Sequence, residues 1–181
     1  LLIMKKFAEL QYVRPNMEKI FARVSGDIAV LKEAKSYEEF RNAYMDYVEA
    51  DTELETSKTI AHVRNTINLL DEFYEAEMVY FNSQMPKYEI LKKEMGEVIV
   101  ASPFKAEMEK EFGTILIQNM EAQKQLSDES IVDDQVKEAE LVSRFMKTQA
   151  AATVEFKGEQ IGNYGLLKIM QSTDRAERKE A

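Results

Sequence analysis

The chain has 181 residues, a length that suits one hydrophobic core better than two independent domains. Its 24 basic and 33 acidic residues give a net charge of −9, which argues against a nucleic-acid partner, because nucleic-acid binders concentrate lysine and arginine. With no cysteine, six glycines and three prolines, the composition excludes disulfides and thiolate metal sites and disfavours a turn-rich β sandwich.

The start of the chain and its longest apolar runs bear on localisation. No apolar run reaches membrane-spanning length, so we expect no membrane partner. Apolar residues precede the first charges, which is the reverse of a secretory signal. Together with the lack of cysteine, this order favours a cytoplasmic protein. Met4 is the expected natural first residue, which would make residues 1–3 a start-site artefact.

The first predicted helix follows the turn at residues 14–16. Apolar residues recur at three- and four-residue steps from Met17 to Leu31, which is the pattern of an amphipathic helix. Asn16 stands directly before this stripe, where its side chain can accept a bond from an unpaired backbone N–H. The sequence therefore predicts a helix that is capped by Asn16.

A second, longer helix is predicted after Ser36. Ser36 and Glu39 have the spacing of a capping box, in which each side chain accepts a bond from the other's backbone N–H. Apolar positions then continue from residue 40 to residue 70. A run of this length predicts either one extended helix or two helices that are separated near residues 56–59.

A third apolar stripe runs from Phe73 to Val98 and contains Pro86. Proline removes a backbone hydrogen bond and clashes with the preceding turn, so we expect a kink or a break there. The pair Ser102-Pro103 predicts a restart, with Ser102 as the cap and Pro103 at the first helical position.

Two further helices are predicted before residue 150. Phe104, Met108 and Phe112 share one face, and Gly113 either ends that helix or lies within a longer one. Ser127 is expected to open the next helix, whose apolar positions are Ile131, Val132, Val136, Ala139, Val142, Phe145 and Met146. Long helices cannot bury such stripes alone. We therefore predict an all-α fold of long antiparallel helices in a bundle or array.

The periodicity changes after residue 150. Residues 153–161 alternate between apolar and polar side chains, with Lys157-Gly158 as a two-residue turn, which predicts a β-hairpin. Gly162 and Gly165 predict a loop, and residues 166–170 a short apolar turn. The expected organisation is a helical region over 1–150, a hairpin and loop over 151–165, and the start of another helical region over 166–181.

The last residues predict the first turns of a helix. Ser172 is the expected N-cap, and Asp174 lies in the first turn, where the helix dipole favours negative charge. No glycine, asparagine or proline stop signal follows, so we expect this helix to be truncated at Ala181.

Candidate catalytic groups are few. His62 is the only histidine, whereas a zinc protease needs two histidines one helical turn apart and a glutamate that activates water. We therefore predict no catalytic, cofactor-binding or metal-ligating residue, and a structural role for His62. The acidic residues Asp71, Glu72, Glu75 and Glu77 are interpreted as a solvated helix face.

Several segments, taken in order, resemble one family. They are Lys6-Phe7 with Tyr12-Val13-Arg14-Pro15-Asn16-Met17-Glu18, Arg64-Asn65-Thr66-Ile67-Asn68 with Asp71-Glu72-Phe73-Tyr74-Glu75-Ala76-Glu77, Ser102-Pro103-Phe104-Lys105-Ala106-Glu107, and Phe156-x-Gly158 with Met170-Gln171-Ser172-x-Asp174-Arg175-x-x-Arg178. The chain resembles the N-terminal part of the oligoendopeptidase F branch of the thimet-oligopeptidase-like zinc metallopeptidases. Lys105 departs from the arginine that is usual there.

The resemblance implies a scaffold role. The family's zinc motif, His-Glu-x-x-His with a downstream glutamate, is absent and would lie beyond Ala181, so no metal ligand is carried onto this chain. In the family, the N-terminal helices form one wall of a channel that admits short peptides, and the zinc lies in the C-terminal part. The implied partners are that catalytic part of the same polypeptide and short peptide substrates.

A competing hypothesis is a self-contained helical adaptor or interaction domain. The two hypotheses differ at the C-terminal end. A fragment would leave apolar residues of the hairpin and of residues 166–170 exposed, which favours self-association or local disorder, whereas an adaptor would bury them in its own core.

Overall fold

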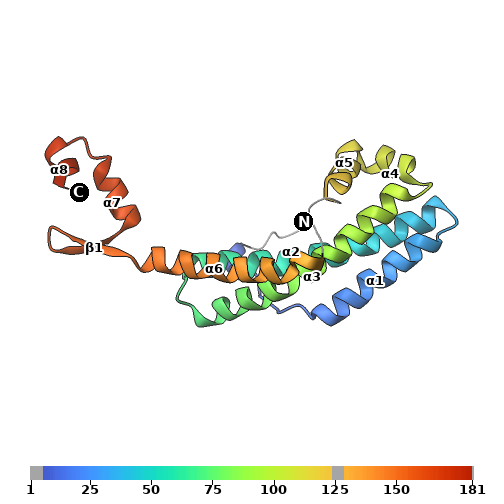
Figure 1. The fold of residues 1–181 in the computed structure, drawn as a ribbon, viewed down its shortest axis with the longest axis horizontal. Helices are drawn as coiled ribbons and strands as arrows, with labels where there is room; N and C mark the ends of the chain where they lie inside the picture. The colour runs from blue at the N-terminus through green and yellow to red at the C-terminus, as the bar shows by residue number, and fades with distance from the viewer. Residues whose placement is uncertain (1–5, 124–128, 181) are drawn as a thin grey trace. The chain divides into compact units, whose positions relative to one another are not determined.

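The computed structural model describes residues 6–123 and 129–180. The described residues form eight α-helices, two short 3₁₀ helices and one β-hairpin, which confirms the predicted all-α class (Figure 1). The chain divides into two units, unit 1 (Leu1–Val136) and unit 2 (Lys137–Ala181). No helix among the described residues combines the length and the hydropathy that a membrane span requires.

Three long helices form the body of unit 1. They lie side by side and alternate in direction (Figure 1): α1 (Met17–Glu33), α2 (Tyr37–Ile67) and α3 (Glu72–Ala101). The long run after Ser36 is thus one helix rather than two. Of the kink or break predicted at Pro86, the break is wrong, because α3 continues through this proline, and the kink stays a prediction. Phe81 and Tyr88 are buried on either side of this proline, and their packing holds the helix together.

The predicted N-caps of α1 and α2 are present, with one difference. Asn16 Oδ1 accepts a hydrogen bond from the Lys19 N–H at 3.0 Å, and Ser36 Oγ accepts one from the Glu39 N–H at 3.2 Å. The Glu39 carboxylate, however, accepts from the Lys35 N–H at 3.0 Å rather than from Ser36. The capping box is therefore one residue wider than predicted, because the longer glutamate side chain reaches past Ser36.

The core of unit 1 lies between these helices. Its buried side chains on α1 to α3 include Met17, Ile20, Val24, Ile28, Leu31, Phe40, Tyr44, Tyr47, Leu54, Phe81, Tyr88, Met95 and Ile99. Burial of one such side chain contributes about 1.5–3 kcal/mol, so this set dominates the stability of the unit. Ile67, Leu70 and Phe73, which the apolar pattern also includes, are exposed because they flank the turn between α2 and α3.

The restart after α3 differs in detail from the prediction. Ser102 Oγ accepts a hydrogen bond from the Phe104 N–H at 3.2 Å, but α4 begins only at Lys105. Pro103 is therefore part of a turn that the Lys105 N–H closes on the Ser102 carbonyl, at 3.3 Å.

Two short helices complete unit 1: α4 (Lys105–Phe112) and α5 (Thr114–Gln123). Gly113 separates them, in agreement with the first of the two predicted alternatives. Each helix adds one buried side chain to the core, Met108 from α4 and Ile117 from α5. The predicted cap Ser127 lies outside the described residues. The chain resumes with η2 (Glu129–Ile131) and α6 (Val132–Ala151), which crosses the boundary between the two units.

The predicted hairpin is present in unit 2. Strands β1 (Thr153–Phe156) and β2 (Glu159–Gly162) pair antiparallel, with Val154 opposite Ile161. Lys157 and Gly158 form the two-residue turn with φ values of 53° and 83°. This left-handed geometry is that of a type I′ turn, whose twist matches that of the strands.

A helix, α7 (Asn163–Met170), replaces the predicted loop and apolar turn. Gly165 does not interrupt this helix. It lets α7 approach the hairpin, since a Cβ at this position would lie 2.2 Å from Ile161 Cγ2. The last helix, α8 (Arg175–Glu180), has Asp174 as its cap rather than Ser172, because Asp174 Oδ1 accepts from the Ala176 N–H at 2.8 Å.

Candidate functional surfaces

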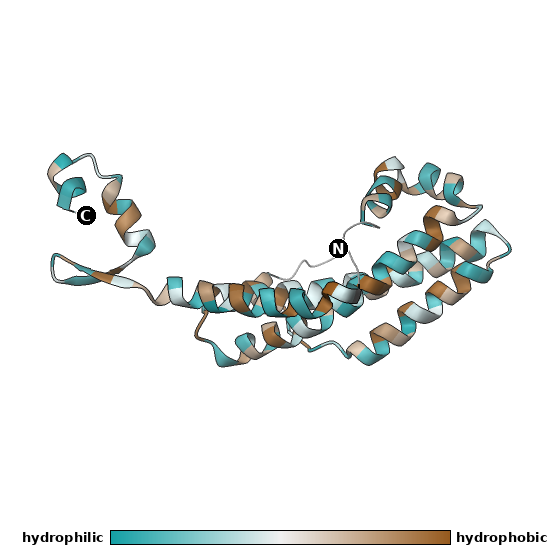
Figure 2. Ribbon diagram, in the orientation of Figure 1, coloured by the Kyte–Doolittle hydropathy of each residue, from teal (hydrophilic) through white to brown (hydrophobic). Residues whose placement is uncertain are grey.

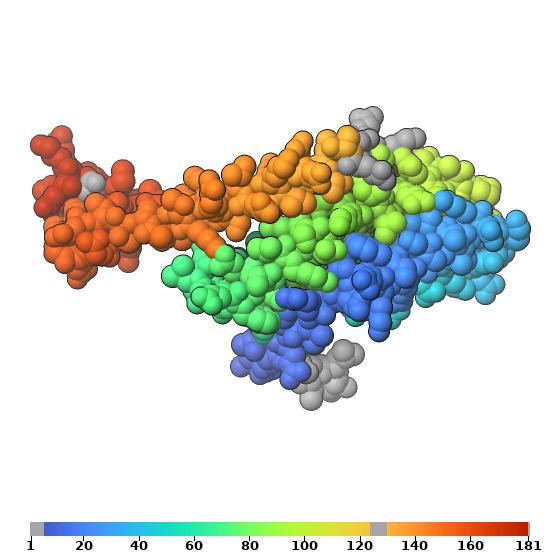
Figure 3. Space-filling model, turned by 60° about the horizontal axis from the view of Figure 1, so that its bottom comes forward, coloured from blue at the N-terminus to red at the C-terminus, as the bar shows by residue number. Residues whose placement is uncertain are grey.

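Side-chain contacts, rather than regular secondary structure, hold the N-terminal segment, residues 6–16, against the helices of unit 1. It contains only one short turn, η1 (Phe7–Glu9), and then leads into α1. It lies against α3 (Figure 3), and the Tyr80 hydroxyl of that helix donates to the Pro15 carbonyl at 2.9 Å.

A buried carboxylate anchors this segment. Glu77 on α3 is 1% exposed, and the Nε of Arg14 donates to both of its oxygens at 3.0 Å. A second guanidinium nitrogen and the Tyr12 hydroxyl also donate to this carboxylate. The Arg14 guanidinium lies 4.7 Å from the centre of the Tyr80 ring, a cation–π contact. The prediction that Glu77 belongs to a solvated acidic face is therefore wrong.

The contacts in this cluster shift the pKa values of Glu77 and Tyr12. Hydrogen bonding from Arg14, opposed by burial, holds the pKa of Glu77 below its ordinary value. Burial, with the Glu77 carboxylate nearby, raises the pKa of Tyr12 above its ordinary value. Both Glu77 oxygens accept hydrogen bonds from the segment, so this carboxylate ties the segment to α3. Its role is structural.

A second anchor lies where α2 ends. Arg64 donates to the Leu10 carbonyl of the segment and to the Tyr74 hydroxyl of α3. The Tyr12 ring packs edge-on against Phe73 and Tyr74, with ring centres 6.0 Å and 5.9 Å apart. The N-terminal segment thereby ties the end of α2 to the start of α3.

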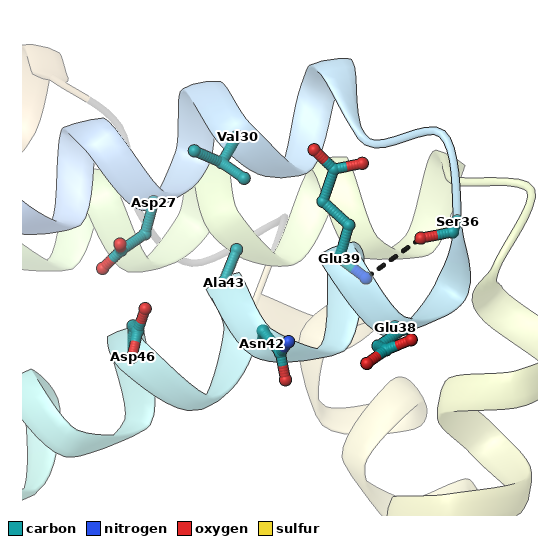
Figure 4. A pocket seen from close by; sticks show the side chains of 8 residues that line it. All are labelled: Asp27, Val30, Ser36, Glu38, Glu39, Asn42, Ala43 and Asp46. Atoms are coloured by element: carbon teal, nitrogen blue, oxygen red, sulfur yellow. Dashed lines mark hydrogen bonds between the residues drawn. The ribbon is translucent and has the colours of Figure 1, made fainter.

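A shallow cleft lies between α1 and α2 (Figure 4). Its lining residues are Asp27, Val30, Ser36, Glu38, Glu39, Asn42, Ala43 and Asp46. The carboxylates of Asp27 and Asp46 point toward one another, and Oδ2 of Asp27 is buried without a hydrogen-bond partner. Burial, and secondarily the charge of Asp46, raises the pKa of Asp27. The cleft therefore combines repelling carboxylates with smaller side chains.

His62 lies on the exposed side of α2, where its backbone carbonyl accepts from the Thr66 hydroxyl at 2.8 Å. It contributes nothing to the core. Within residues 6–123 and 129–180, no group of three or more histidine, cysteine, aspartate or glutamate residues could hold a metal ion.

Unit 2 presents apolar side chains to solvent. Helix α6 buries none of its described residues, and brown segments recur along α6 and α7 (Figure 2). The apolar positions predicted for this helix therefore recur as a pattern, but none of them is buried in the described structure.

Comparison with known proteins identifies the family. Residues 7–127 match the model of the peptidase M3 N-terminal domain. The chain belongs to this family. No protein with a curated description gives a significant match.

Solved structures extend the likeness of this M3 domain beyond residue 127. PZ peptidase A, solved with inhibitor 2, is 31% identical with a TM-score of 0.91, over 96% of this chain and 31% of that one. A protein assigned as an oligoendopeptidase F is also 31% identical with a TM-score of 0.91, over 97% and 31%. Another, from Bacillus anthracis str. Ames, is 25% identical with a TM-score of 0.89, over 95% and 32%.

These matches confirm the resemblance to the N-terminal region of oligoendopeptidase F-type peptidases. The M3 domain described here spans about a third of the length of the solved structures it matches. Sequence reasoning missed the Glu77 cluster, because helical spacing places Glu77 among solvated acids. The sequence held one signal for this cluster: the segments that contain Arg14 and Glu77 both carry the family resemblance.

Proposed function

We propose that this chain is the non-catalytic N-terminal part of a cytoplasmic, zinc-dependent oligopeptidase that hydrolyses short peptides, and that it forms one wall of the substrate channel. The match of residues 7–127 to the M3 N-terminal domain carries this proposal. The long, well-packed helices α1 to α3 suit a rigid wall. A net charge of −9 supports a peptidase without a nucleic-acid partner.

The proposal assigns the chemistry to a catalytic part that follows in the same polypeptide. Residues of this chain do not fit a catalytic zinc, since the sequence has one histidine and no cysteine. A zinc ion held by the catalytic part would supply an activated water for attack on the peptide carbonyl. The contribution of this chain is to position and enclose the peptide. Residues 166–181 begin the helical region that leads toward the catalytic part.

The test compares the isolated chain with the longer polypeptide that carries it. A quenched fluorescent peptide is incubated with each protein, with and without a zinc chelator. We expect chelator-sensitive cleavage by the longer polypeptide only, and no stoichiometric zinc in the isolated chain. A longer polypeptide that binds no zinc and leaves the peptide intact would overturn the proposal.

A control variant addresses the one histidine. Cleavage by the isolated chain that persists in His62→Ala would show a contaminating peptidase. Cleavage by the isolated chain that disappears in His62→Ala would show that this chain is itself catalytic, contrary to the proposal.

A further inference from the structure

Helix α6 carries four large apolar side chains on one exposed face. Leu141, Val142, Phe145 and Met146 are 58%, 54%, 63% and 46% exposed. They form two adjacent pairs, and residues of different pairs are three to five positions apart. The four side chains therefore form a continuous strip along the helix. We call this set the α6 stripe.

Helix α7 repeats this arrangement. Tyr164, Leu167 and Met170 are 89%, 51% and 54% exposed and recur every three residues, so they share one side of the helix. The opposite side carries Gly165, which approaches Ile161 of the hairpin. Packing within unit 2 therefore uses one side of α7 and leaves the other side, which we call the α7 face, in solvent.

The near-neutral charge of unit 2 also suits a docking surface. Of the residues in Lys137–Ala181, eight are basic and seven are acidic, so the unit is almost neutral in a chain of net charge −9. Fully buried interface cores are depleted in charge and rich in aromatic residues and methionine. The two sets of exposed side chains include Phe145, Tyr164, Met146 and Met170.

The solved relatives indicate what covers the α6 stripe and the α7 face. The chain matches them over 95–97% of its own length but only 31–32% of theirs, so about two thirds of each relative's polypeptide lies outside the matched part. An amphipathic helix with anchors at this spacing fits an apolar groove on another folded part. The additional polypeptide of the relatives is a partner of this kind, and it belongs to the same protein.

We propose that the α6 stripe and the α7 face are the surface on which the catalytic part of the peptidase docks. This inference rests on the proposed function and deepens it, because it names the contact surface between the two parts. The partner surface is apolar and accepts one helix face from each of α6 and α7.

The absence of cysteine from the chain permits a direct test with single thiols. Phe145→Cys places a thiol in the α6 stripe, and Ile115→Cys places one at a matched, 67% exposed position on α5 in unit 1. Each variant is prepared as the isolated chain and within the longer polypeptide, from which other cysteines have been removed. The rate of maleimide labelling is measured at nanomolar protein concentration, where self-association is negligible.

We expect the Phe145→Cys thiol to react about tenfold more slowly, or slower still, in the longer polypeptide than in the isolated chain, because an occluded thiol reacts only when the contact opens. Ile115→Cys should react at similar rates in both. Circular dichroism checks that each variant is folded, and Leu141→Cys repeats the test if Phe145→Cys is not.

Three results would overturn the inference: equal labelling of Phe145→Cys in the two proteins, equal slowing of both variants in the longer polypeptide, and protection of Phe145→Cys in the isolated chain. The last would show that the chain covers its own stripe, as a self-contained adaptor would. The proposed function fails separately, through a longer polypeptide that labels as expected yet does not cleave peptide.

Discussion

Unit 1 and unit 2 reach their folded structures by different means. All buried residues in the described part of the chain lie between Pro15 and Ile117, whereas no described residue of unit 2 is buried. Unit 1 carries 16 basic and 26 acidic residues, and unit 2 carries eight and seven. Unit 1 is therefore stabilised by its own core, whereas unit 2 has local structure and leaves its large apolar side chains partly or fully exposed.

The largest expected difference comes from removing one aromatic ring in each unit. Phe40→Ala in unit 1 deletes a fully buried ring and should lower the free energy of unfolding by about 3–5 kcal/mol. Phe145→Ala in unit 2 removes a 63% exposed ring and should change it by less than about 0.5 kcal/mol. Urea unfolding followed by circular dichroism measures both. Similar losses from the two variants would show that unit 2 has a core of its own.

The second prediction tests the pH dependence of the Glu77 cluster. The folded pKa of Glu77 is lower than its ordinary value of 4.5, so its contribution to stability is complete above pH 4.5 and is lost as the pH falls through the folded pKa. Glu77→Gln should lower the free energy of unfolding by about 1–3 kcal/mol at pH 7 and should flatten its decline below pH 4.5.

The matched control for Glu77 is Glu49, which pairs with Arg23 at 2.6 Å but is 74% exposed. Glu49→Gln should change the free energy of unfolding by less than about 0.5 kcal/mol, because exposed ion pairs contribute little. Thermal unfolding from pH 3 to pH 7 compares the two variants. An unchanged acid decline in Glu77→Gln would contradict the structural role of this carboxylate.

The third prediction concerns the close contact between Gly165 and Ile161 in unit 2. Gly165→Ala would place a Cβ 2.2 Å from Ile161 Cγ2 and should destabilise the α7–hairpin contact by about 1–3 kcal/mol. Hydrogen exchange of the α7 amides should become faster, while that of α1 to α3 stays unchanged. The added Ile161→Ala substitution removes the clashing carbon and should restore slow exchange. If exchange stays fast in the double variant, the clash is not its cause.

A matched glycine in unit 1 sharpens this test. A Cβ at Gly96 would lie 3.3 Å from Met120 Cβ, so Gly96→Ala requires a shift of only a few tenths of an ångström. We expect a smaller effect on exchange than that of Gly165→Ala, in the amides of α3 and α5 only.

The smallest expected effect is weak self-association of the isolated chain through unit 2. Exposed apolar side chains favour contact between copies, so sedimentation velocity should show a rising mean mass at high micromolar concentration. Phe145→Ser should reduce this rise, and Ile115→Ser should not. A strict monomer with strongly protected amides over residues 153–180 would instead favour the adaptor hypothesis.

Short-range rules predict much of this fold. Asn16, the stripe from Met17 to Leu31 and the Lys157-Gly158 turn were all predictable, because each depends on residues a few positions apart. Such rules failed at Pro86 and Gly165, where tertiary packing decides whether the backbone continues as a helix. Breaker residues are therefore weak evidence wherever the neighbouring side chains pack well.

The candidate surfaces were less predictable than the helices. Glu77 looks solvated by spacing alone, because the partners that bury it precede it by more than sixty positions. Periodicity predicted three of the four residues of the α6 stripe, Val142, Phe145 and Met146, but it does not reveal whether a stripe is covered. No local pattern reports what a surface meets outside its own unit.

The contact between Arg14 and Glu77 also has a kinetic consequence. It joins residues 63 positions apart, so it forms only after most of unit 1 has been made and brought together. The N-terminal segment should therefore dock after the transition state for folding. Arg14→Met should then leave the folding rate almost unchanged and raise the unfolding rate, so that the N-terminal segment is the last part of unit 1 to take its native position.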